Sequence, residues 1–147
     1  MKVAFYKGRK RIFNRLVSWW TRSPYSHVEL ILDNGLSVSS SFMDGGVRYK
    51  RIVFDPDLWD IIEIHAETPD IAAKINARYG DAYDWRGLIG FVIRPIKDDR
   101  NKMFCSEFLM HLIGYDETWR FDPGTTYPVI KKHSDELMRL RAEGAIQ

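Results

Sequence analysis

Residues 26–42 have the sequence SHVELILDNGLSVSSSF, which is the pattern of two strands joined by a tight turn. Apolar side chains recur at every second position near the turn, as in a strand with one buried face. The turn itself, Asp33-Asn34-Gly35, contains the residue types that tolerate the positive φ angles of hairpin loops. The stretch therefore predicts an antiparallel hairpin with strands at 27–32 and 36–42.

The number of loop residues decides which side chains of this hairpin stand opposite one another. A two-residue loop puts Ser40 opposite Glu29. A three-residue loop with a left-handed glycine instead puts Ser39 opposite Glu29, and in the same register Ser41 stands opposite His27. Side chains alternate between the two faces of a strand, so His27 and Glu29 share one face. The sequence leaves both registers open, and in the second register serines line the face of the histidine.

The elements predicted outside the hairpin change from strands to helices along the chain. Further strands are expected at 1–6, 47–54 and 59–65. Helices are expected in a short segment that ends at residue 20 and at 68–78, 85–93, 105–113 and 134–142. Strands followed by helices are typical of an α+β domain with an antiparallel sheet. We therefore expect a single α+β domain over residues 1–147.

The composition is that of an ordinary globular protein. Of the 147 residues, 45% are hydrophobic and 29% are charged, and the formal net charge is +2. The single cysteine rules out an internal disulfide, so nothing indicates an oxidising compartment. No apolar run approaches the roughly 18 residues of a membrane span, and the N-terminus lacks the apolar core of a signal peptide. These features predict a cytoplasmic protein.

The N-terminal segment is strongly basic, because seven cations precede the first acidic residue of the chain: Lys2, Lys7, Arg9, Lys10, Arg11, Arg15 and Arg22. Apolar residues recur within it at helical spacing, namely Ile12, Leu16, Trp19 and Trp20. We interpret this stripe as a core face with the charges in water, because a small domain buries its tryptophans. The alternative is a weak contact with an anionic membrane or a nucleic acid through Lys7, Arg9, Lys10, Arg11 and Arg15.

The only cysteine, Cys105, lies at the predicted first turn of a helix, in Phe104-Cys105-Ser106-Glu107-Phe108-Leu109. A thiolate is the attacking form of cysteine, and a free thiol, with a pKa of about 8.5, is mostly protonated at neutral pH. The positive end of a helix and a neighbouring imidazolium both stabilise the anion. With His27 at the start of a strand, the sequence indicates a thiol nucleophile. The alternative is that Cys105 is a small buried hydrophobic residue.

These features together resemble a known family. Ser26-His27-Val28, a turn with Asn34-Gly35, and a polar residue twelve positions after the histidine are similar to the histidine hairpin of the NlpC-type papain-like hydrolases. Here the histidine precedes the cysteine helix, as in the circularly permuted branch with the YiiX-like bacterial proteins and the lecithin:retinol acyltransferase group. Tyr83-Asp84, upstream of the cysteine, also resembles that branch. The resemblance covers roughly residues 24–115.

The resemblance implies a papain-like fold in which Cys105 is the nucleophile and His27 is its base. The third catalytic position, twelve residues after the histidine, is Ser39, where the family usually has His, Glu, Asn or Gln. Glu29 stands where the family commonly has glycine, and it is the second candidate for orienting the imidazole. By spacing, Ser39 is the preferred third member.

The function implied by the resemblance is thiol-dependent hydrolysis of an amide or ester bond, in a peptide, an isopeptide or a lipid acyl group. By analogy Tyr83 and a group near Tyr25 line the substrate site. No metal and no cofactor are expected, because a zinc site from His27, His65 and Cys105 has no close-spaced ligand pair. The alternative is a papain-like binding module without turnover that uses the basic segment. The short chain also resembles small proteins of tailed-phage genomes, which implies action in a host cell.

Overall fold

Five antiparallel strands form the centre of the protein. The computed structural model describes residues 1–8, 10–64, 68–83 and 103–145; the predicted helix at 85–93, together with Arg9, His65 and Asp84, lies outside these ranges. The strand order is β4-β3-β2-β1-β5, and every pairing is antiparallel. The strands are β1 (Lys2–Tyr6), β2 (His27–Ile31), β3 (Ser37–Ser41), β4 (Gly46–Lys50) and β5 (Trp59–Glu63). This confirms the predicted α+β class with an antiparallel sheet.

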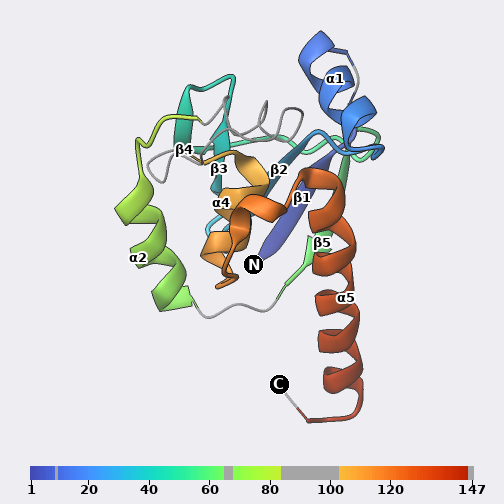
Figure 1. Ribbon diagram of the computed structural model, residues 1–147. Coiled ribbons are helices and arrows are strands. Elements are labelled where there is room, and N and C mark those ends of the chain that lie inside the picture. The colour runs from blue at the N-terminus through green and yellow to red at the C-terminus, as the bar shows by residue number, and fades with distance from the viewer. Residues whose placement is uncertain (9, 65–67, 84–102, 146–147) are drawn as a thin grey trace.

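Helices cover one face of this sheet and extend from its ends. Those in the described ranges are α1 (Ile12–Trp20), α2 (Thr68–Arg78), α4 (Cys105–Leu112), the 3₁₀ turn η1 (Thr118–Arg120) and α5 (Pro123–Ala142). Helix α4 packs on β2 and β3, and α5 packs beside β5 (Figure 1). Helix α1 and the C-terminal end of α5 lie at opposite ends of the molecule (Figure 1). Within the described ranges, no helix has both the length and the hydropathy that a membrane crossing requires.

The β2–β3 hairpin has the register that a three-residue loop produces. Leu30 pairs with Val38 across the two strands. Gly35, the last of the three loop residues, has a φ of +77°, which residues with a Cβ rarely adopt. Ile31 pairs with Ser37 in the same register. Of the two predicted registers, the three-residue loop is therefore confirmed.

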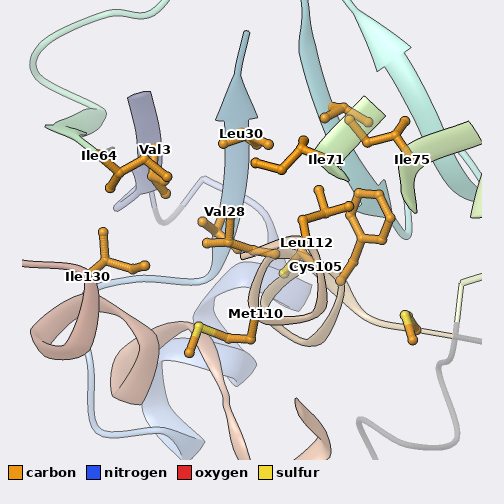
Figure 2. Packing of buried hydrophobic residues seen from close by; sticks show 14 of the residues in the cluster. Val3, Val28, Leu30, Ile64, Ile71, Ile75, Cys105, Met110, Leu112 and Ile130 are labelled. Carbon is orange, nitrogen blue, oxygen red and sulfur yellow. The ribbon is translucent and has the colours of Figure 1, made fainter. Parts of the chain in front are cut away.

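One face of the sheet and helix α4 enclose the hydrophobic core. Val28 and Leu30 of β2 lie in the same cluster as Leu112 of α4, as Figure 2 shows. Strand alternation puts His27 and Glu29 on the other face of β2. The largest fully buried apolar side chains are Val3, Phe5, Val28, Leu30, Val38, Ile75, Phe108, Leu109, Met110, Leu112 and Ile130. The packing that buries α4 also fixes the first residue of that helix against the sheet.

Hydrogen bonds from neighbouring elements hold the first turn of α4. Ser40 on β3 donates its hydroxyl to the carbonyl of Met103, two residues before Cys105. Ser106 donates its hydroxyl to the carbonyl of Phe121 at 2.7 Å. Both serines are buried. The position of the thiol therefore depends on side chains of β3 and α4 as well as on hydrophobic packing.

Two predicted boundaries are wrong. Strand β4 ends at Lys50 rather than at residue 54, because its partner β3 begins at Ser37, which pairs with Lys50. Helix α5 begins at Pro123 rather than at residue 134. Its start is a capping box, in which the Asp122 side chain accepts from the Thr125 N–H and the Thr125 hydroxyl accepts from the Asp122 N–H. This cap and a proline at the first helical position stabilise a helix that the sequence alone had not predicted there.

The apolar stripe of α1 is exposed, and this contradicts the prediction that it forms a core face. The exposed residues are Ile12, Leu16, Trp19 and Trp20. The buried residues of the helix are Val17 and Ser18. Apolar residues that recur at helical spacing show that one side of a helix is apolar and the other polar. The spacing does not show which side packs on the rest of the protein.

The hydroxyl of Ser40 is predicted to stabilise the fold, whereas the equally buried hydroxyl of Ser37 is not. Ser40→Ala removes a donor from the buried Met103 carbonyl, which should lower the free energy of unfolding by about 1–3 kcal/mol. Ser37 lies on the same strand, and its hydroxyl has no hydrogen-bond partner among the described residues, so Ser37→Ala is the matched control. Urea unfolding followed by circular dichroism measures both. Equal losses in the two variants would contradict this assignment.

Candidate active site

Cys105 is the first residue of α4, so its side chain lies at the positive end of the helix dipole. The N-cap residue, Phe104, has an extended backbone, and its carbonyl accepts from the N–H of Phe108 at 2.9 Å. Cys105 itself is 3% exposed. The N–H groups of a first helical turn have no acceptor within the helix. The predicted position of the cysteine at a helix start is therefore confirmed.

His27 is the first residue of β2, the strand on which α4 packs. Its Nε2 lies 2.8 Å from Oε1 of Glu29, which is two residues further along the same face of the strand. The thiol of Cys105 lies close enough to the imidazole to raise its pKa. Because Nε2 is engaged by Glu29, Nδ1 is the ring nitrogen available to the sulfur. The imidazole is 20% exposed. The structure thus brings Cys105 and His27 together from distant parts of the sequence.

The imidazole of His27 has a strongly shifted pKa. Burial by itself lowers the pKa of a histidine, because desolvation disfavours the charged ring. Here two neighbours, Cys105 and Glu29, outweigh the effect of burial, each through its charge and its hydrogen bonding. Together they raise the pKa of His27 to about 10. Both neighbours therefore favour the imidazolium at neutral pH. An imidazolium beside a cysteine sulfur is the arrangement that stabilises a thiolate.

Glu29 is the buried centre of this arrangement, with a side chain that is 1% exposed. Arg48 on β4 donates to both of its carboxylate oxygens, from Nη1 to Oε2 at 2.8 Å and from Nη2 to Oε1 at 2.6 Å. Burial raises the pKa of a carboxyl group, but the hydrogen bonds from Arg48 and His27 outweigh it and hold the pKa of Glu29 below its ordinary value of 4.5. The carboxylate therefore stays ionised between two cations.

Glu29, rather than Ser39, is hydrogen-bonded to the imidazole, and this corrects the predicted order of preference. The hydroxyl of Ser39 donates to the carbonyl of Val28 at 2.7 Å. The strand registers explain why. Ser39 pairs with Arg48 of β4, and the residue before it, Val38, pairs with Leu30 of β2. The hydroxyl of Ser39 is taken up by the backbone, whereas the longer side chains of Glu29 and Arg48 reach each other.

Sequence reasoning missed Arg48 and its partner Asp44. The Nε of Arg48 donates to Oδ2 of Asp44 at 2.7 Å, and Lys50 donates to Oδ1 of the same carboxylate at 2.8 Å. Burial raises the pKa of Asp44, but the hydrogen bonds from Lys50 and Arg48 outweigh it and lower that pKa well below its usual range. A signal for a cation was present in the sequence, because a glutamate on a strand beside the core needs one. The predicted turn at 44–46 does not identify it, because the actual turn is residues 42–45, which pairs Arg48 with Ser39.

A cleft of about 300 Å³ opens beside these charges. His27 and Glu29 line it together with Trp59, whose ring centroid lies 6.4 Å from that of His27. Tyr83, predicted to be near the substrate, is also in its wall, where its ring packs edge-on against Phe42. The start of α1 and the β3–β4 turn complete one side of the cleft with Arg11, Phe13, Asn14, Phe42 and Met43.

Tyr25, the other predicted lining residue, lies elsewhere. Its hydroxyl donates to Oδ2 of Asp60 at 2.6 Å, and its ring stacks on Tyr127 at a centroid distance of 4.5 Å. Burial and the hydrogen bond with Asp60 raise the pKa of Tyr25 above its ordinary value. Tyr25 is therefore a buried packing residue between β5 and α5, whereas its neighbour Ser26 lines the cleft, so the expectation of a group near Tyr25 holds for Ser26 and not for the tyrosine itself.

The zinc alternative cannot be built from the described residues. His65, one of its three ligands, lies outside them. Within the described ranges, no group of three or more His, Cys, Asp or Glu side chains is arranged to hold a metal ion. The chemistry available at this site is therefore considered from its thiol, imidazole and carboxylate.

Comparison with protein-family models and with curated protein sequences finds no match to this chain. The assignment of the site therefore rests on the geometry of Cys105, His27 and Glu29 and on the resemblance in their spacing.

The titration of His27 tests this geometry directly. With ¹⁵N-labelled histidine, we expect NMR to show both ring nitrogens of His27 protonated at neutral pH and a pKa of about 10. Glu29→Gln and Cys105→Ser each remove a neighbour that raises the pKa of His27 and should lower that pKa, whereas Ser39→Ala should leave it unchanged. A His27 that titrates near the ordinary value of 6.5 in the unmodified protein would contradict the ion-pair arrangement.

The same shift predicts a dependence of stability on pH. The pKa of His27 is raised on folding, so its contribution to stability is complete below about 6.5 and is lost as the pH rises through about 10. The pKa of Glu29 is lowered, so its contribution is present above 4.5 and is lost as the pH falls through its folded value. Urea unfolding across this range should show the alkaline loss in the unmodified protein and a smaller loss in His27→Gln.

Proposed function

We propose that this protein is a papain-like thiol hydrolase that cleaves amide or ester bonds through a covalent acyl intermediate on Cys105. The observations that support the proposal are the hydrogen bonds from His27 to Glu29 and from Arg48 to Glu29, together with the thiol of Cys105, which is near enough to His27 to raise its pKa. Nucleophilic catalysis by cysteine uses a thiol at a helix start, an imidazolium beside that thiol and a group that orients the imidazole ring, which here is a buried carboxylate.

The proposed reaction has two chemical steps. The Cys105 thiolate attacks the acyl carbon, and as the amine or alkoxide departs, His27 gives its Nδ1 proton to the leaving group. This forms a thioester and a neutral imidazole. His27 then takes a proton from water while the resulting hydroxide attacks the thioester carbon. The thiolate departs with the electrons of the carbon–sulfur bond, which restores the thiolate–imidazolium pair and releases a carboxylic acid.

Each supporting residue has a distinct part in this mechanism. Glu29 holds the imidazole through Nε2 and stabilises its positive charge, and Arg48 keeps Glu29 ionised. The backbone N–H of Cys105 is at the first position of α4 and has no acceptor within the helix, so it suits the developing oxyanion. Glu29 and Arg48 are positioning residues, since they act on the substrate through His27.

The substrate is proposed to be an amide or ester with an apolar portion, such as a peptide, an isopeptide or a lipid acyl group. The walls of the cleft carry the aromatic rings of Phe13, Phe42, Trp59 and Tyr83. Arg11 lies at the same cleft. Aromatic walls favour apolar groups, and an exposed guanidinium favours an anionic group nearby.

A second candidate function is a papain-like binding module without turnover. The observation that favours it is the low exposure of Cys105, whose sulfur must be reached by any substrate. The thiol reactivity of the folded protein separates the two candidates, because a module without turnover does not need a stabilised thiolate.

The decisive experiment measures alkylation of Cys105, the only cysteine of the chain, by iodoacetamide across a pH series. The thiolate–imidazolium pair should keep the unmodified protein reactive at neutral pH, with a rate about tenfold or more above that of His27→Gln. Glu29→Gln should also react slowly, while Ser39→Ala is the matched control and should react like the unmodified protein. Intact mass confirms a single site, and urea-unfolded protein gives the reactivity of the free thiol.

Turnover on a panel of activated amide and ester substrates completes this test. Cys105→Ala should abolish it, and His27→Gln should reduce it by about 100-fold or more. Equal alkylation rates in the unmodified protein and in His27→Gln, together with no turnover, would reject the hydrolase and favour the binding module.

A further inference from the structure

Helix α1 presents an apolar stripe away from the rest of the protein. Ile12 is 76% exposed and Trp19 is 74% exposed, and Leu16 and Trp20 are exposed on the same side of the helix. Successive residues of a helix are about 100° apart, so Val17 and Ser18 lie about 100° and 200° around the axis from Leu16. Those two residues are the buried ones. The apolar stripe therefore points outward while the opposite side faces the body.

Contacts on the body side fix this orientation. The ring of Phe13 stacks on Phe42 of the β3–β4 turn, with centroids 4.8 Å apart and planes 12° apart. Ser18 donates its hydroxyl to the carbonyl of Pro24 at 3.3 Å. In Figure 1, α1 stands at one end of the molecule, beyond the strands. The stripe is thus held outward by packing on its other side.

The chain segment that carries this stripe is basic. No acidic residue precedes Glu29 in the sequence. The exposed cations of the described segment near α1 are Lys10, Arg11, Arg15 and Arg22. Lys7 differs from them, because it forms an ion pair with Asp60 at 2.7 Å. These four cations have no ion-pair partner among the described residues, and an exposed apolar stripe with such cations beside it matches a surface that is itself apolar and anionic.

We propose that α1 docks the protein on an anionic lipid surface. The apolar stripe enters the boundary between headgroups and acyl chains, and Lys10 and Arg15 contact the phosphate level. Trp19 and Trp20 are the side chains that prefer this boundary. This inference is independent of the proposed thiol chemistry, because it uses no residue of the catalytic contact.

Two other occupants fit the observations less well. A nucleic acid would use the cations, but it gives no reason for Ile12 and Leu16 to be exposed beside them. A second copy of the chain, in a two-fold contact through α1, would bring the same cations of both copies together, which costs electrostatic energy. A lipid surface accommodates both the stripe and the charge.

Docking through α1 also has a consequence for the cleft. Arg11 donates to the sulfur of Met43 at 3.2 Å, and Met43 and Phe42 are themselves exposed. Arg11, Phe42 and Met43 all line the cleft beside His27. The docking surface and the mouth of the cleft are therefore adjacent, so a protein bound through α1 holds its cleft close to the lipid.

The test is flotation of the full chain with vesicles of phosphatidylcholine alone or mixed with phosphatidylserine. We expect binding to the mixed vesicles, weakened by salt, and little binding to phosphatidylcholine. Lys10→Gln with Arg15→Gln should weaken binding about tenfold or more, and the matched control, Lys131→Gln with Lys132→Gln on α5, should weaken it much less. Cys105→Ala should bind like the unmodified protein, which separates this test from that of the hydrolase.

A second set of variants tests whether the apolar stripe of α1 is needed for binding to vesicles. Leu16→Gln with Trp19→Gln should abolish flotation without loss of stability, because both side chains are exposed. Trp119→Gln with Met138→Gln alters two other exposed apolar residues and should leave flotation unchanged. Brominated phosphatidylcholine in the mixed vesicles should quench tryptophan fluorescence, and Trp19→Phe should lose part of that quenching.

Three results would overturn the proposal. The first is equal flotation of the stripe variant and the unmodified protein. The second is absence of flotation with salt-sensitive binding of an oligonucleotide that the stripe variant retains. The third is absence of flotation with a dimer in analytical ultracentrifugation that Leu16→Gln with Trp19→Gln converts to a monomer, which would assign the stripe to a second copy.

Discussion

A buried carboxylate with two cationic partners is the constraint on which the rest of this structure depends. Glu29 is almost fully buried, and its charge is opposed by Arg48 on one side and by His27 on the other. Removing one partner from a buried ion pair costs about 3–5 kcal/mol, because it leaves an unopposed charge. The sheet must therefore keep β2, β3 and β4 in the one register that lets these side chains meet. The same register sets the position of the imidazole relative to α4.

That register links the local turn chemistry to the candidate site. Gly35 closes a three-residue loop, and the loop length pairs Val38 with Leu30, while the next strand pairs Arg48 with Ser39. A shift by one residue would send the side chains of β3 to the opposite faces. Ser40 would then leave the Met103 carbonyl that it holds beside the start of α4. The length of this one loop therefore helps to position both the strand that carries His27 and the helix that carries Cys105.

The parts of the structure that the sequence predicted are those controlled by local patterns. Alternation and turn residues predicted the hairpin, and the cysteine was correctly expected at a helix start. The Glu29–Arg48 pair was missed because it depends on two strand registers at once. The preference for Ser39 came from spacing in a family, whereas the bond to His27 depends on which side chain is long enough to reach it. The exposed stripe of α1 was misread because periodicity carries no information about tertiary packing.

The way α1 is attached has a consequence for the energy landscape of the folded state. Two of its nine residues are buried, and it has no place in the sheet or in the main hydrophobic cluster. Its hydrogen bonds can therefore open in a local fluctuation that leaves β2, β3 and α4 intact, because few buried contacts are lost. In amide hydrogen exchange, we therefore expect α1 to lose protection before the elements that carry Cys105 and His27. A substitution on the outward side of α1 thus changes the exchange rates of the α1 amides, while the amides of β2, β3 and α4 keep their protection from exchange.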